Sequence, residues 1–112
     1  PEVVFDLSTD LLAKLQKASA VLSLPDLVLE SNGTVVTLNV RDKKNPSSNQ
    51  FSEVMMDGDG QTYTMNFKME NIKVVKDEYT VKVSSKGLSQ FVAKNKGLEY
   101  FIALEPDSVF GS

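Results

Sequence analysis

One order of predicted elements occurs twice in this chain, and it constrains the fold more than any other feature. In each half, a predicted strand is followed by a helix and then by three strands, with the break in the loop Asp57–Gly60. Leu7 and Leu15 overlay on Phe67 and Val75 at one constant offset. Residue identity between the halves is low, so the repeat is one of pattern, and the copies must pack together to bury both helices.

The repeat predicts the domain organisation and the fold class. A chain of 112 residues has the length of one typical domain. We therefore expect a single domain over 1–112, with the first repeat at 1–57 and the second at 61–108. Two similar halves of this kind predict an α+β fold, with both helices on one side of antiparallel sheets.

The first helix has both a start signal and an apolar stripe. An apolar run at Val3–Phe5 predicts a strand, and the residues after it are typical of helix N-caps, of which we choose Ser8. Pro25 disfavours helical geometry in the residue before it, so the helix must end by there. The apolar stripe between these limits consists of Leu11, Leu12, Leu15, Ala18 and Leu22.

The rest of the first half predicts three strands. Asn32-Gly33 between apolar runs is typical of a tight hairpin turn. The strands before and after it are expected at 27–29 and 34–41. A polar loop at 41–49 then leads to a strand at 51–56.

The second half repeats this plan with a shorter helix. Residues 63–67 alternate between apolar and polar and predict a strand. Met69, Ile72 and Val75 recur every third residue, which predicts a helix of about two turns. Three further strands are expected, at 79–83, 88–94 and 98–104, and Pro106 ends the last of them.

Composition excludes most kinds of catalysis. The chain has no Cys and no His, so it has no disulfide framework, thiol nucleophile, histidine general base or cysteine zinc site. No apolar run approaches the roughly 20 residues of a membrane-spanning helix, so we expect no membrane partner. The net charge is −3, from 15 acidic against 12 basic residues, which taken as a whole repels nucleic acid.

Two short motifs resemble functional sites, but turns in the chain account for their residues better. Asp57-Gly58-Asp59-Gly60 resembles the start of a calcium loop, but neither register has the glycine that an EF-hand needs at its sixth position. Asn32-Gly33-Thr34 matches a glycosylation sequon, and the hairpin accounts for all three residues. No pair of acids is placed in a shared apolar pocket, so we expect no enzyme, no catalytic residue, no metal and no cofactor.

The lysines of the two predicted helices form matching pairs. Lys14 and Lys17 are three residues apart in the first helix, and Lys73 and Lys76 are three residues apart in the second. Each pair alone is typical of a solvated helix face. If the helices lie side by side, however, four ammonium groups share one surface of an otherwise acidic domain. Such a surface could hold a phosphate backbone through non-specific, salt-sensitive contacts.

Two apolar features remain. Phe51 and Val54 belong to a predicted strand after a long polar loop, which is a plausible sheet edge. An apolar edge must be covered by loops of the domain itself or paired with another subunit. Near the chain end, Leu104 and Pro106 lie close to the turn at Lys86–Leu88, where they either cap the core or line a shallow groove.

Two stretches carry a resemblance to a known family. These are Tyr63-Thr64-Met65-Asn66-Phe67 before the short helix, and the chain end from Glu99 to Ser108, which closes on Ala-Leu-Glu-x-Asp-Ser. Through them the chain resembles the DNA polymerase sliding clamps, specifically the C-terminal domain of the T-even-type phage clamp. In that family a domain consists of two strand-helix-strand-strand-strand units, which is the repeat described above.

The resemblance implies a function and a set of partners. Such domains close into a ring whose helices line a hole for duplex DNA, and the ring tethers the polymerase for processive synthesis. The clamp has no catalytic activity, and a clamp loader ATPase opens it. The resemblance makes Lys14, Lys17, Lys73 and Lys76 the DNA-facing residues, and it implies action in the cytoplasm of the infected bacterial host.

The resemblance also implies two protein contacts. The strand with Phe51 and Val54 would join neighbouring clamp subunits in the ring, a trimer when full length. A groove for the C-terminal peptide of the polymerase would be formed by Leu88, Ala103, Leu104 and Pro106. Family subunits carry a further N-terminal domain, so we expect this chain to be the C-terminal half of a larger subunit. The alternatives are a structural or adaptor domain that makes only protein contacts and, last, an enzyme whose carboxylates converge in a deep pocket.

Overall fold

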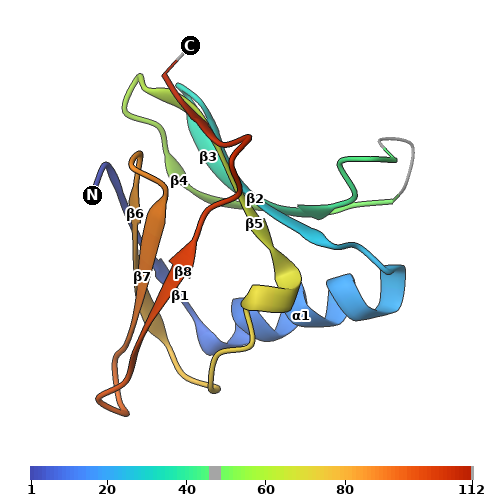
Figure 1. Cartoon of the computed structure of the whole chain (residues 1–112), viewed down its shortest axis with the longest axis vertical. Coiled ribbons are helices and arrows are strands. Elements are labelled where there is room, and N and C mark those ends of the chain that lie inside the picture. Colours follow the sequence, from blue (N-terminus) through green and yellow to red (C-terminus); the bar gives the residue numbers. More distant parts are fainter. Residues whose placement is uncertain (46–48, 112) are drawn as a thin grey trace.

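Two antiparallel sheets make up most of the molecule (Figure 1). The computed structural model describes residues 1–45 and 49–111, so Pro46, Ser47 and Ser48 of the predicted polar loop lie outside the described residues. The four-stranded sheet has the order β1-β6-β7-β8, with β1 Val3–Leu7, β6 Tyr79–Ser84, β7 Leu88–Ala93 and β8 Glu99–Ala103. The five-stranded sheet has the order β4-β3-β2-β5-β9, with β2 Asp26–Asn32, β3 Val35–Arg41, β4 Phe51–Asp57, β5 Thr62–Lys68 and β9 Val109–Phe110.

The two halves of the chain exchange their first strands. β1 leaves the first half and pairs with β6, with Phe5 opposite Val81. β5 leaves the second half and pairs with β2, with Leu29 opposite Met65. Each sheet therefore contains strands from both halves, which is how the two copies of the pattern pack into one core. The α+β class with antiparallel sheets is confirmed, whereas the division into repeats at 57 and 61 stays a prediction.

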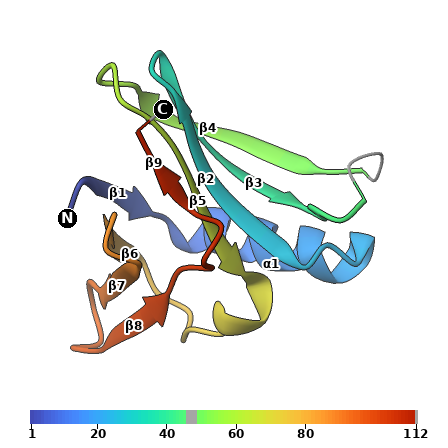
Figure 2. The ribbon, with the colours of Figure 1, turned by 45° about the horizontal axis from the view of Figure 1, so that its top comes forward.

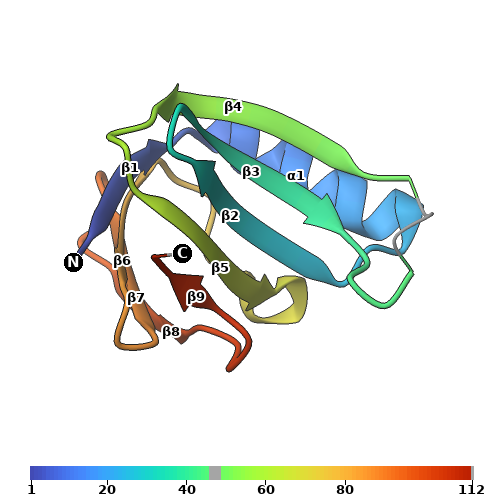
Figure 3. The same cartoon turned by 90° about the horizontal axis from the view of Figure 1, so that it is seen from above.

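The first helix forms where the sequence predicts it. α1 spans Thr9–Leu22, and the N–H of Leu11 donates to the hydroxyl of Ser8 at 3.1 Å, which confirms the N-cap. Leu12 and Leu15 are its buried residues, and α1 lies under the strands β2 to β4 (Figure 3). Leu22, predicted on the buried stripe, is 40% exposed because it lies in the last turn, before Ser23 ends the helix in a left-handed conformation.

The prediction of a second helix of two turns is wrong. Only a single 3-10 turn forms, η1 Met69–Asn71, and its flanking residue Lys68 makes no side-chain cap hydrogen bond. Ile72 and Val74 are buried while the residues between and after them are exposed, an alternation typical of extended chain. These β-branched side chains also fit a helix poorly. The three-residue spacing that suggested a helix is thus overridden by a two-residue burial pattern.

Aromatic side chains join the two sheets at the centre of the core. Phe67 of β5 meets Phe91 of β7 edge to face, with ring centroids 6.4 Å apart. Phe91 also meets Tyr79 of β6 at 6.2 Å. All three rings are buried, and burial of such a side chain is worth roughly 1.5–3 kcal/mol, so this cluster helps to hold the two sheets together. Within residues 1–45 and 49–111, no helix is both long and apolar enough to span a bilayer.

Candidate nucleic-acid interface

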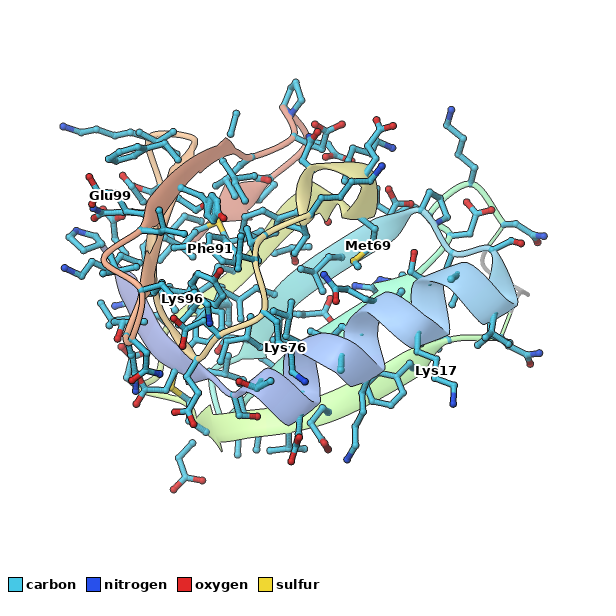
Figure 4. The ribbon with its side chains drawn as sticks, turned by 90° about the horizontal axis from the view of Figure 1, so that it is seen from below. Lys17, Met69, Lys76, Phe91, Lys96 and Glu99 are labelled. Carbon is cyan, nitrogen blue, oxygen red and sulfur yellow. The ribbon has the colours of Figure 1, made fainter. Side chains whose placement is uncertain are left out.

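α1 and the segment that follows β5 lie side by side on one face of the molecule (Figure 4). The amide of Gln16 donates to the backbone carbonyl of Ile72 at 3.1 Å, which fixes the segment to the helix. A hollow of about 550 Å³ runs between them and is lined by Gln16, Ser19 and Ala20 on one side and by Met69, Ile72 and Lys73 on the other. The two lysine-bearing elements are therefore adjacent, although only one of them is an α-helix.

All four sequence-predicted lysines are exposed on these two elements. The ion pairs in the described part of the chain use other cations, namely Arg41, Lys43, Lys68 and Lys94. Lys14 lines a hollow between α1 and β4, whereas Lys73 lines the hollow on the opposite side of α1. Lys17 is exposed on α1, and it is visible together with Lys76 in the view from below (Figure 4).

The other side chains of α1 and its surroundings are partly small and partly acidic. Ala13 and Ala20 are exposed on α1 and carry no group that could read base edges. Glu53 shares the hollow beside Lys14, and Glu70 shares the hollow beside Lys73. Acidic side chains thus lie among the lysines, which disfavours tight binding of phosphates.

Two tyrosines hold the irregular segment that carries Lys73 and Lys76. The hydroxyl of Tyr100 accepts from the N–H of Val75 at 3.1 Å, and the hydroxyl of Tyr79 donates to the Val75 carbonyl. Burial raises the pKa of Tyr79 to about 12, so it remains a donor at every physiological pH. These side-chain hydrogen bonds hold the backbone of Val75 in place of the backbone hydrogen bonds that a helix would have made.

The buried carboxylate of Asp77 also holds this segment in place. Asp77 is 4% exposed and accepts from the N–H of Asn95 at 3.1 Å, from its side-chain amide at 2.7 Å and from the N–H of Glu78 at 2.7 Å. Burial alone would raise the pKa of Asp77, but these hydrogen bonds outweigh it and hold the pKa below its ordinary value. The turn between β7 and β8 is thereby tied to the lysine-bearing segment.

One lysine next to this segment, Lys96, was not predicted from the sequence. The ammonium of Lys96 donates to the backbone carbonyl of Lys76 at 2.8 Å. The Asn95-Lys96-Gly97 stretch predicts a turn, but no periodicity relates that turn to the helix pairs. Only the pairing of β7 with β8 brings it here.

With this geometry established, comparison with known proteins assigns the family. The family model described as "gp45 sliding clamp, C terminal" matches residues 4–106. This chain belongs to the gp45 sliding clamp family. A curated protein named "Sliding clamp" from Vibrio phage KVP40 is 35% identical over 104 residues, which are 90% of this chain and 46% of that protein. The chain therefore spans about half the length of the curated relative that it matches.

The family assignment confirms the resemblance drawn from the two sequence stretches, and it does not favour a purely structural or adaptor domain. The edge predicted for this clamp domain is present as a strand. β4 lies at the end of the five-stranded sheet and pairs only with β3 among the described strands. Val54 is 65% exposed, whereas Phe51 is half-buried against the core.

The four residues predicted to form a peptide groove are not all brought together. Leu88 and Ala103 are direct partners in the pairing of β7 with β8, and both are exposed. Leu104 follows them but is buried, with its N–H bonded to the Gly87 carbonyl at 3.0 Å. Pro106 lines a separate hollow with Lys43 and Lys68, whereas Leu88 lines one of about 440 Å³ with Lys82 and Phe101.

Proposed function

We propose that this domain is part of a sliding clamp that encircles duplex DNA and tethers the replicative polymerase during phage DNA replication. The observation that carries the proposal is the adjacency of α1 and the segment 72–77, whose four lysines are exposed and outside the ion pairs of the described residues. The family assignment supports it. The clamp acts without catalysis and without a cofactor, in the cytoplasm of the infected bacterial host.

The chemistry of the face explains how a clamp can hold DNA and still move. Lysine ammonium groups attract phosphates without regard to base sequence, and each contact releases condensed counterions. Small side chains such as Ala13 and Ala20 make no base contact that would favour one position over the next. Contacts to the backbone alone can therefore exchange along the duplex, which is what sliding requires.

Partners are assigned to the remaining surfaces. The free edge of β4, with Phe51 and Val54, joins the next clamp subunit by strand pairing, and three full-length subunits close the ring. The C-terminal peptide of the polymerase binds near Leu88 and Ala103, with Leu104 and Pro106 shaping the end of its groove. A clamp loader ATPase opens the ring. This chain supplies the C-terminal half of each subunit, with 1–112 as a single domain.

Processive synthesis tests the proposal. The complete clamp subunit would be prepared with Lys14→Glu, Lys17→Glu, Lys73→Glu and Lys76→Glu, loaded onto a primed circular template and supplied with its polymerase. Reversing four phosphate contacts should shorten the products about tenfold or more at physiological salt.

A matched control uses Lys82 of β6 and Lys86 of the turn after it, which line a hollow with Leu88. Because that hollow is assigned to the polymerase, the control is read in DNA binding without polymerase: Lys82→Glu with Lys86→Glu should leave the salt dependence of duplex binding unchanged, whereas the fourfold variant should reduce it. Full product length with the fourfold variant, under conditions where loading is complete, would contradict the DNA-facing assignment.

A further inference from the structure

The turn between β7 and β8 reaches the face that carries the lysine pairs. Figure 4 shows Lys96 close to Lys76 there. The Lys96 ammonium donates to the carbonyl of Lys76 at 2.8 Å, across 20 positions of sequence. An ammonium has three donor hydrogens, so this bond leaves two of them for an oxygen acceptor outside the protein.

The turn is fixed rather than loosely placed. Both carboxylate oxygens of Asp77 bind Asn95, one through its N–H at 3.1 Å and the other through its side-chain amide at 2.7 Å. The carbonyl of Lys76 and the carboxylate of Asp77 thus engage consecutive residues of the turn. Lys96 therefore has a defined position beside Lys76 although it comes from a different sheet hairpin.

The ammonium of Lys96 is not engaged in an ion pair. Lys96 is exposed and takes part in no ion pair within the described ranges. Its charge helps to lower the pKa of Asp77, but that carboxylate is buried and its oxygens accept from Asn95 and Glu78. Lys96 therefore adds an exposed ammonium next to the backbone of Lys76.

We propose that Lys96 is a fifth phosphate-binding lysine of the DNA-facing surface, positioned there by its bond to Lys76 and by the Asp77–Asn95 contact. The proposal rests on the proposed function, because it assumes that duplex DNA lies against α1 and the segment 72–77. It also gives the irregular segment a role. The carbonyl of Lys76 in that segment accepts a hydrogen bond from Lys96 of the turn between β7 and β8, which holds this additional cation in place.

A salt titration separates this role from a structural one. The complete clamp would be mixed with a short fluorescent duplex, and its affinity measured by anisotropy from low to moderate salt. Log affinity falls as log salt rises, and each phosphate contact adds about 0.9 to the steepness of that fall. Lys96→Met should therefore make the slope shallower by about 1 and weaken binding several-fold. Lys96→Arg, which keeps the charge, should restore the slope.

Lys86 and Lys17 provide the controls. Lys86 is an exposed lysine on the turn at the other end of β7, and Lys86→Met should leave the slope unchanged. If Lys17→Met lowers the slope while Lys96→Met does not, the role of Lys96 is refuted and the clamp function stands. If neither lowers it, both the role of Lys96 and the proposed DNA-facing surface are contradicted.

Discussion

Asn66 and Asp107 bind each other across 41 positions of sequence: the amide of Asn66 donates to the Asp107 carboxylate at 3.1 Å. Asn66 lies in β5, where its N–H donates to the hydroxyl of Ser108 at 2.8 Å and its carbonyl accepts from the N–H of Glu105 at 2.8 Å. The two stretches through which the chain resembles the clamp family therefore meet at Asn66. The chain end covers the edge of β5, and β9 continues that cover (Figure 2).

This contact predicts the effect of a minimal change at the chain end. Ser108→Ala removes the acceptor for the half-buried N–H of Asn66 and should lower the free energy of unfolding by about 1–3 kcal/mol, measured by urea denaturation. Ser85→Ala is the control, because its hydroxyl bond to Glu2 is exposed to solvent and its loss should change stability by less than about 0.5 kcal/mol. A loss below about 0.5 kcal/mol for Ser108→Ala would show that the bond between Ser108 and Asn66 does not stabilise the fold.

The same contact predicts an acid-dependent stability. The Lys43 ammonium, and then the Asn66 amide, hold the pKa of Asp107 below its ordinary value. The ionised carboxylate therefore stabilises the folded state above the ordinary pKa of about 3.9, and this stability is lost as the pH falls through the lowered pKa. Asp107→Asn should reduce stability at pH 5–7, and its deficit should shrink below about pH 4. A deficit that stays constant down to pH 2 would rule out the carboxylate as its source.

The packing of α1 predicts unequal effects of one substitution at two sites. Leu15 is 1% exposed, so Leu15→Ala should cost about 2–5 kcal/mol through lost burial and a cavity under the sheet. Leu22→Ala removes the same atoms from a side chain that is 40% exposed and should cost under about 1 kcal/mol. Denaturation of both variants gives the comparison, and similar losses would mean that the last turn of α1 packs more tightly than described.

Local patterns predicted the strands and α1 because each carries a signal that tertiary packing does not override. Val36, Leu38 and Val40 alternate with polar residues, and Ser8 supplies a cap directly before an apolar stripe. The segment after Met69 fits both a three-residue and a two-residue period. Its form is decided by Tyr79 and Tyr100, whose bonds to Val75 depend on the assembled sheet.

The candidate site was partly predictable for the same reason. Lys14 and Lys17 follow from a helix whose face the sequence defines, and Lys73 and Lys76 are exposed next to that helix although their own helix is absent. Their contact with DNA stays a prediction. Lys96 could not be found, since a turn between two strands has no periodicity and reaches this face only through strand pairing. β9 was missed because its two residues after Pro106 are too few to show alternation.

The central claim is that duplex DNA lies against the face of α1, and proximity tests it most directly. The chain contains no Cys, so Lys17→Cys and Lys86→Cys each give this domain one position for a photoactivatable crosslinker. With the complete clamp loaded on circular duplex, the group at position 17 should crosslink to DNA and the group at position 86 should not. Crosslinking from position 86, with none from position 17, would contradict the account.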